Sequence, residues 1–280
     1  DELSRKMAKL CQIYINDAFA TAHRAQASTH GVAKYASVSA AGPLLINELK
    51  ALTKALRKPA KPIVAIIGGA KVSTKLTILE TLFEKVDKLI LGGGIVNTFL
   101  KAAGYEIGKS LYEPNLVKIA GKLIEQAEKN NCAIPLPVDV VTGENFDENT
   151  IAKTKSINEI EKNDIIMDVG PKTIKQLNEI ILKAKTIVWN GPLGVFEFKQ
   201  FSQGTKNLAK AIATSNAYSI AGGGDTIAAI SKFKVKKNIS YISTGGGAFL
   251  EFLEGKKLPA IAILEEAARA WAAMEKAREL

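Results

Sequence analysis

The chain has 280 residues, and at roughly 150 residues per domain this length predicts about two domains or one large α/β domain. A composition of 47% hydrophobic and 24% charged residues with 22 glycines is typical of a globular protein and excludes a collagen, a low-complexity tail or a disulfide scaffold. The net charge of +10 comes mainly from lysines scattered along polar helix faces, which disfavours a nucleic-acid-binding protein.

Neither a membrane span nor a signal peptide is indicated. No run reaches the roughly 18 apolar residues that a transmembrane helix needs, so we expect a cytoplasmic protein with no membrane partner. Cys11 and Cys132 lie far apart in apolar runs and no Cys-x-x-Cys occurs, so we expect two reduced, buried thiols. The chain opens on Asp1 within a helical pattern, which predicts a truncated or processed product of a larger protein.

The N-terminal part combines a partial domain with a connecting segment. A helix over 2–10 and a strand over 12–16 precede a polar loop, and so few strands make no stable sheet alone. Residues 1–42 are therefore predicted to be the remnant of a second α/β domain. Residues 43–62, a helix over 43–56 followed by a proline-punctuated stretch, are predicted to connect it to the next domain.

Short β-branched apolar runs then alternate with amphipathic helical stretches, which is the pattern of βαβ units in a parallel sheet. The expected strands are the runs 63–67, 88–91, 133–137, 186–189, 218–221 and 239–243. They predict an α/β fold over residues 63–263, with a doubly wound parallel sheet of about six strands and helices on both faces. Residues 264–280 carry apolar residues at helical spacing, which predicts an amphipathic C-terminal helix that packs on another element.

Glycine clusters distinguish this chain from a generic α/β domain. Each follows an expected strand and precedes an expected helix: 68–69, 92–94, 222–224 and 245–247. In a parallel sheet such turns meet at the carboxyl edge, where backbone amides and helix N-termini approach phosphate oxygens closely. One such turn could merely satisfy backbone geometry, but the whole set predicts a nucleotide or phosphate-ester site. No cluster completes the dinucleotide fingerprint, and the stretch 104–110 is one residue short of a Walker A loop.

Polar residues beside these glycines are the candidates for the chemistry. Lys71 and Lys75 lie four apart after the first cluster, a spacing that on a helix places both ammonium groups on one face, suited to a polyphosphate. Asp225 and Thr226 begin the helix after the third cluster, where an aspartate serves either as N-cap or as a Mg²⁺ ligand.

Two loops add further candidates. Asn190 and Glu197 follow a strand on a rigid loop, where the amide could hold phosphate oxygens and the carboxylate could accept from ribose hydroxyls. A simple turn with a surface glutamate is the alternative for this loop. The polar loop 16–26 contains His23 and Arg24, and an arginine there could grip an anionic substrate bidentately, although lone loop arginines are often merely exposed.

Taken together, these motifs resemble phosphoglycerate kinase over residues 1–264. The segments that carry the resemblance are Gly68-Gly69-Ala70-Lys71-Val72-Ser73, Trp189-Asn190-Gly191-Pro192, Gly222-Gly223-Gly224-Asp225-Thr226 and Ser243-Thr244-Gly245-Gly246-Gly247-Ala248. The resemblance implies reversible phosphoryl transfer between 1,3-bisphosphoglycerate and Mg-ADP, giving 3-phosphoglycerate and Mg-ATP in glycolysis, across a hinged cleft between two domains.

The resemblance also implies roles for individual residues. The nucleotide side comprises Gly68, Gly92 and Gly93 at the adenine, Glu197 at the ribose, Lys75, Asn190, Gly223, Gly224 and Thr226 at the phosphates with Pro192 beside them, and Asp225 at the Mg²⁺. The transfer side comprises Lys71, Gly245, Gly246 and Gly247 at the moving phosphoryl group, and Arg24 with His23 at the glycerate substrate. Positioning and electrostatic stabilisation suffice for such a transfer.

The sequence also departs from the family pattern. A large part of the second domain, with the Asp-Phe-Asn-Val-Pro and His-Leu-Gly-Arg-Pro motifs and the arginines that bind 3-phosphoglycerate, is absent, and the tail 266–280 has no family counterpart. We therefore expect a chain that binds nucleotide but turns over poorly. The alternative is a non-catalytic Mg-nucleotide-binding or interaction module, in which the edge of strand 12–16 pairs with another chain, although the family is monomeric. A dinucleotide-dependent oxidoreductase is disfavoured because its fingerprint is missing.

Overall fold

The computed structural model describes residues 1–56 and 59–278, which form two compact units. Unit 1 is Asp1–Lys54 together with Ser243–Leu280, and unit 2 is Ala55–Ile242. This division differs from the expected one, which assigned 63–263 to a single domain. Residues 57–58 of the predicted linker and 279–280 of the predicted tail lie outside the described residues.

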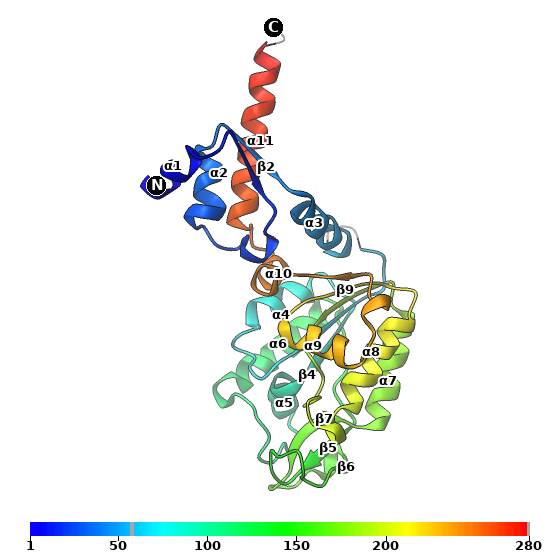
Figure 1. Cartoon of the computed structure of the whole chain (residues 1–280). Coiled ribbons are helices and arrows are strands. Elements are labelled where there is room, and N and C mark those ends of the chain that lie inside the picture. Colours follow the sequence, from blue (N-terminus) through cyan, green and yellow to red (C-terminus); the bar gives the residue numbers. More distant parts are fainter. Residues whose placement is uncertain (57–58, 279–280) are drawn as a thin grey trace. The chain divides into compact units, whose positions relative to one another are not determined.

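The centre of unit 2 is a five-stranded, all-parallel sheet of order β10-β9-β8-β3-β4 (Figure 1). Its strands are β3 (Ile63–Gly68), β4 (Lys88–Gly92), β8 (Thr186–Asn190), β9 (Tyr218–Ala221) and β10 (Tyr241–Ile242). Every residue of β3 is buried, as expected for a strand covered on both faces. The predicted α/β fold is confirmed.

One expected strand of this sheet is reduced to a single contact. The run 133–137 contributes only an isolated parallel bridge between Ala133 and Lys88. Pro135 and Pro137 explain the difference, because a proline has no N–H with which to continue a strand ladder.

The helices of unit 2 pack in two groups (Figure 1). The first comprises α4 (Leu76–Phe83), α5 (Gly93–Ala102) and α6 (Val117–Lys129), and the second comprises α7 (Pro171–Lys183), α8 (Gln203–Thr214) and α9 (Gly224–Lys232). Short 3-10 helices are η3 (Pro114–Leu116), η4 (Ile157–Glu159), η5 (Lys199–Phe201) and η6 (Lys236–Asn238). Ile66 and Trp189 of the sheet share one buried cluster with Leu177 and Leu208 of the second group. The sheet therefore presents its alternate side chains to this layer.

Unit 2 also contains a small antiparallel sheet that the sequence pattern did not predict. Its order is β6-β5-β7, formed by β5 (Asp139–Gly143), β6 (Lys153–Ser156) and β7 (Ile165–Val169). The carboxylate of Asp139 accepts the backbone N–H groups of Lys172 and Thr173 at 2.9 and 2.7 Å, which caps α7. This cap ties the small sheet to the helices of the large one.

Unit 1 is built on a two-stranded parallel sheet of β1 (Ile13–Asn16) and β2 (Val38–Ala41). Its helices are α1 (Glu2–Ala8), α2 (Val32–Tyr35), α10 (Gly246–Leu253), α11 (Pro259–Arg278) and all but the last two residues of α3 (Pro43–Leu56), with the 3-10 helix η1 (Phe19–Thr21) and the π-helix η2 (Ala27–Gly31). A Cβ on Gly245 would lie 2.6 Å from Cδ1 of Phe19, so α10 begins directly against η1. This close packing explains why residues 243–263 belong to unit 1.

The C-terminal helix α11 is longer than predicted and only its beginning is buried. Ala260, Ile263 and Leu264 are buried, and α11 contacts α2 and β2. Trp271 and Met274 are 45% and 55% exposed. Leu264 of the predicted helix therefore packs on other elements, whereas Trp271 and Met274 do not, because the helix extends beyond the elements that cover its first turns.

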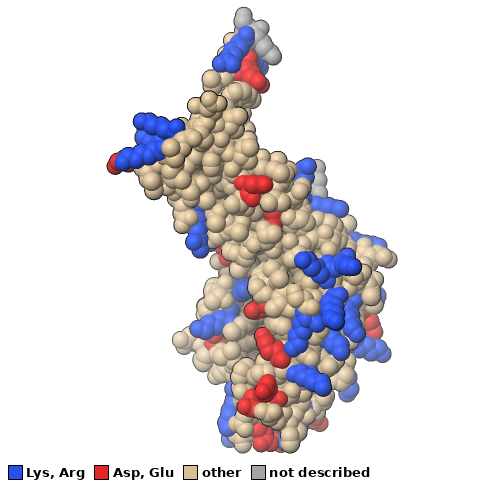
Figure 2. Space-filling model, in the orientation of Figure 1, with Lys and Arg blue, Asp and Glu red and all other residues tan. Residues whose placement is uncertain are grey.

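Three expectations from composition concern the whole chain. Among the described residues, no helix combines the length and the apolar character needed to cross a membrane. Cys132 is buried as expected, whereas Cys11 is only half-buried, and both are free thiols. Figure 2 shows lysine and arginine side chains in several separate places with acidic side chains among them, which agrees with the predicted scatter of charge.

Candidate active site

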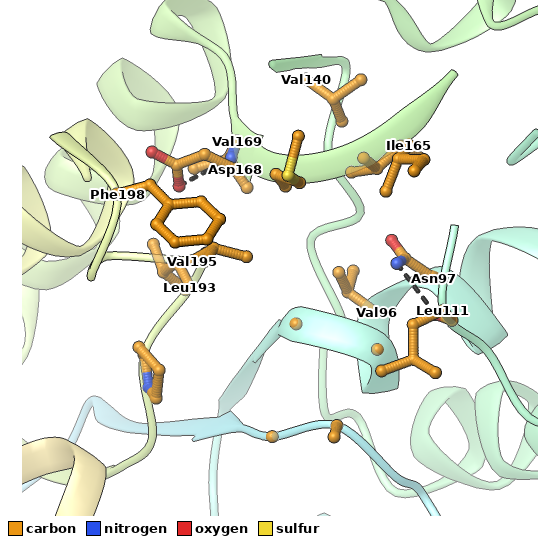
Figure 3. Close-up of a pocket in the computed structure, with 18 of the residues that line it drawn as sticks. Val96, Asn97, Leu111, Val140, Ile165, Asp168, Val169, Leu193, Val195 and Phe198 are labelled. Carbon is orange, nitrogen blue, oxygen red and sulfur yellow. Dashed lines mark hydrogen bonds between the residues drawn. The ribbon is translucent and has the colours of Figure 1, made fainter. Parts of the chain in front are cut away.

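A cavity of about 380 Å³ lies in unit 2 beside the ends of β3 and β4 (Figure 3). Gly69 and Gly93 line it from these two strand ends, and Glu197 and Asp225 line it with carboxylates. The remaining wall is largely apolar, with Val96, Leu111, Val140, Ile165, Met167, Leu193 and Phe198 among its residues. A concave apolar space with a few polar groups is the usual form of a small-molecule site.

The glycines at the ends of β3 and β4 are required by the close approach of another loop. A Cβ on Gly68 or on Gly92 would overlap the carbonyl oxygen of Pro192. Gly191, before that proline, has a φ of 111°, a conformation that favours glycine. The structure therefore brings the predicted residues Gly68, Gly92 and Pro192 together at one edge of the sheet.

The third glycine turn joins the same edge through side-chain hydrogen bonds. Nδ2 of Asn190 donates to the carbonyl of Gly222 at 2.7 Å, and the Thr226 hydroxyl accepts the N–H of Gly191 at 2.7 Å. Gly223 has a φ of 98° and precedes α9, and Asp225 is exposed in the first turn of that helix. These bonds hold the end of β8 and the start of α9 together. The two segments form one framework that carries backbone amides and the Asp225 carboxylate.

Lys75 points its ammonium group into this framework. Its Nζ donates to Oδ1 of Asn190. Burial lowers the pKa of Lys75 to about 8 because water is removed from the ammonium group, and the Asp225 carboxylate offsets part of the effect. An ammonium group held in this way is ready to pair with a phosphate.

The expected helical pairing of Lys71 with Lys75 is wrong. Helix α4 begins at Leu76, so Lys75 is its N-cap, and Lys71 is exposed in the turn before it. Oε2 and Oε1 of Glu113 accept the N–H and the hydroxyl of Ser73 at 2.8 and 2.6 Å, and this holds the turn out of the helix. The Lys71 ammonium group therefore comes from a loop, and the Lys75 ammonium group comes from the start of α4.

The contact with Glu113 was not anticipated from the sequence, because Ser73 lies 40 residues away. Burial alone would raise the pKa of Glu113, but the hydrogen bonds from Ser73 and the nearby Lys71 lower it overall. Glu113 is therefore an ionised anchor for the loop that carries Lys71.

A second unanticipated group is Asp168, a buried residue that lines the cavity. Its oxygens accept the backbone N–H groups of Gly204 and Val169 at 2.7 and 2.9 Å. Burial raises the pKa of Asp168 to about 7, although these hydrogen bonds act in the opposite direction. A lone aspartate at the end of a strand carries no sequence signal of such burial.

The fourth glycine turn, at 245–247, lies in unit 1 and not with the other three in unit 2. A Cβ on Gly247 would lie 2.9 Å from Nε2 of His23, and Nε of Arg24 donates to the same nitrogen at 3.4 Å. His23 and Arg24 therefore stand beside the N-terminus of α10. The N–H and hydroxyl of Thr244 both donate to Glu48 at 2.7 Å, which positions the start of this helix.

The sequence matches the family described as phosphoglycerate kinase over residues 1–256. The chain belongs to the phosphoglycerate kinase family. It is 57% identical to a solved phosphoglycerate kinase from Coxiella burnetii, with a TM-score of 0.93 over 95% of this chain and 68% of that chain. It is also 34% identical to a phosphoglycerate kinase from Pyrococcus horikoshii OT3, with a TM-score of 0.83 over 96% of this chain and 68% of that one. The family prediction from the glycine motifs is confirmed.

Phosphoglycerate kinases use a magnesium nucleotide, and the residues present fit that requirement. No group of three or more His, Cys, Asp or Glu side chains that could hold a metal ion occurs within 1–56 and 59–278. Mg²⁺ usually takes only one or two protein carboxylates and completes its shell with water and substrate phosphates. The exposed carboxylate of Asp225, beside the Lys75 ammonium group and the glycine turns, suits such a shared ion.

Proposed function

We propose that unit 2 of this chain binds Mg-ADP and Mg-ATP as the nucleotide half of the phosphoglycerate kinase reaction. The observation that carries the proposal is the Lys75 ammonium group on Asn190, next to glycine turns and an apolar cavity. A cation, glycine turns and an apolar space side by side match the phosphates and the base of a nucleotide.

Within this proposal the predicted nucleotide residues other than Pro192 have separate roles. Gly68, Gly92 and Gly93 border the base and Glu197 holds the ribose. Lys75, Asn190 and the start of α9, with Gly223, Gly224 and Thr226, hold the phosphates, and Asp225 binds the Mg²⁺. The ion would neutralise phosphate charge when bound.

We propose unit 1 as the glycerate-binding half of the reaction. Arg24 and His23 bind the glycerate, and the amides of Gly245, Gly246 and Gly247 at the start of α10 stabilise the transferring group together with Lys71. A terminal oxygen of ADP attacks the phosphorus of the acyl phosphate, the bond from phosphorus to the acyl oxygen breaks, and 3-phosphoglycerate leaves as a carboxylate. Turnover by this chain is proposed to be weak, and its location cytoplasmic.

The first test is calorimetric titration with Mg-ADP of the chain and of two lysine variants. Lys75→Ala should weaken binding at least tenfold, because a charged hydrogen bond to phosphate is lost. Lys175→Ala, an exposed lysine on α7, is the matched control and should bind as the unsubstituted chain does. Failure of the correctly folded chain to bind Mg-ADP would contradict the proposed function. A coupled assay with 3-phosphoglycerate then measures turnover.

A non-catalytic nucleotide-binding or interaction module is the second candidate. Ile13 and Ile15 of β1 are 58% and 59% exposed, and exposed apolar side chains on a strand favour association with another chain. Sedimentation analysis distinguishes the two functions. Self-association abolished by Ile13→Lys, without turnover, would favour the module.

A further inference from the structure

The second half of helix α11 is exposed along its whole length. The helix contacts α2, β2 and η2, but its buried residues all lie between positions 260 and 264, and every residue from 268 to 278 is exposed. Figure 1 shows the red end of α11 running past the elements of unit 1 that cover its beginning. Most helices in proteins gain their stability by packing an apolar face on another element, and this segment presents such a face to solvent.

The exposed face has the spacing of a coiled-coil seam. Steps of four and three residues alternate along α11 through Ala260, Leu264, Ala267, Trp271, Met274 and Arg278. This is the heptad spacing that turns side chains toward a second helix. The seam is buried in unit 1 at its start, whereas Trp271 and Met274 are 45% and 55% exposed. Ala268, Ala270 and Ala277 flank the exposed part, and such small side chains let a second helix approach closely.

The charges beside the seam indicate which helix fits it. If two copies of α11 run antiparallel and cross near position 272, Glu266 lies level with Arg278 of the second copy. The same arrangement brings Arg269 level with Glu275 of the second copy. A parallel pair would instead place each of these charges beside its own copy, which is repulsive. Antiparallel helices also oppose their macrodipoles, so the segment is complementary to itself in that orientation.

We propose that residues 265–278 of α11 pair with the same segment of a second copy of this chain, as an antiparallel two-helix contact. The pairing is isologous, so it closes as a two-fold dimer. It is independent of the proposed nucleotide function, because the segment belongs to unit 1 and lies beyond the residues that match the family, 1–256. The contact extends over roughly 21 Å of helix, which is small for a protein interface, so the dimer should be weak, with a micromolar dissociation constant.

Sedimentation equilibrium of the full chain, from about 1 to about 300 µM, tests the pairing. The chain should pass from monomer to dimer within this range. Trp271→Lys should raise the dissociation constant at least tenfold, because it would bury an unpaired charge in the seam. Leu182→Lys is the matched control, since Leu182 is an exposed apolar residue on α7 of unit 2, and it should dimerise as the unsubstituted chain does. Met274→Lys replaces Trp271→Lys if circular dichroism shows that the latter does not fold.

Charge reversal tests the orientation of the two helices. Glu266→Arg should raise the dissociation constant about fivefold, since an attraction becomes a repulsion on both sides of the dimer. Adding Arg278→Glu should restore the dimer. The two positions are roughly 18 Å apart along one helix, so the restoration must arise between two chains.

Three results would overturn the proposal. One is a chain that stays monomeric at every concentration. Another is a dimer that Trp271→Lys leaves intact, and its loss in Ile13→Lys would then assign the contact to β1. The third is a double charge variant that dimerises no better than Glu266→Arg, which would exclude the antiparallel pairing.

Discussion

We predict that the affinity of the proposed site for ADP depends on pH because of the pKa of Lys75. Burial lowers this pKa to about 8 in the free chain, so Lys75 loses its proton as the pH rises through that value. Bound phosphates favour the charged ammonium group and raise the pKa again. Below about pH 8 both states carry the proton and Lys75 adds no pH dependence to binding. Above it, binding must take up a proton, so affinity falls as the pH rises.

The size of the effect follows from the two pKa values. If bound phosphates restore the ordinary value of 10.5, the dissociation constant for Mg-ADP should rise about 20-fold between about pH 7.5 and about pH 9.5. Calorimetric titration across this range measures the change. Repeating each titration in buffers of different ionisation enthalpy measures the proton taken up.

Lys75→Arg supplies the control, because a guanidinium stays protonated throughout this range. Its affinity should be nearly constant with pH. A flat profile for the unsubstituted chain would refute the reasoning, and so would an equal slope in Lys75→Arg, since the pH dependence would then belong to other groups.

Three further predictions concern stability and reactivity. Because the pKa of Asp168 is raised to about 7, the folded chain binds more protons than the unfolded one between about pH 4 and about pH 7, so its stability should fall as the pH rises through that window. Asp168→Asn should remove this dependence, as measured by urea unfolding at several pH values, and persistence of the slope would argue against Asp168. Gly68→Ala should destabilise unit 2 by about 1–3 kcal/mol through overlap with the neighbouring loop. In the same unfolding assay, Gly121→Ala, on a helix position with open space, should stabilise it by about 0.5–1 kcal/mol. In a thiol-labelling assay the half-buried Cys11 should react before Cys132, because burial raises the pKa of Cys132 to about 11; faster labelling of Cys132 would contradict this.

Much of the site follows from local sequence. Gly68, Gly92 and Gly223 lie where strands end and loops approach closely. The local backbone geometry requires glycine at these positions, so the sequence alone indicates them. Alternating strand and helix patterns determined the parallel sheet for a similar reason, since burial on both faces demands runs of apolar residues. Together these signals were sufficient to predict the α/β fold, the family and the edge of the sheet that carries three of the glycine turns.

Tertiary structure decided the rest because it depends on contacts between distant residues. Glu113 holds the loop that carries Lys71 out of α4. The spacing of Lys71 and Lys75 therefore gave a wrong prediction that both lie on one helix face. The pKa values of Lys75 and Asp168 come from lost water, which is a property of packing and not of sequence. Asn97 looks like any helix residue, and only the fold leaves its Oδ1 buried without a hydrogen-bond partner among the described residues. Periodicity identifies which residues are buried, but only the assembled fold determines which polar groups are buried with a partner and which without.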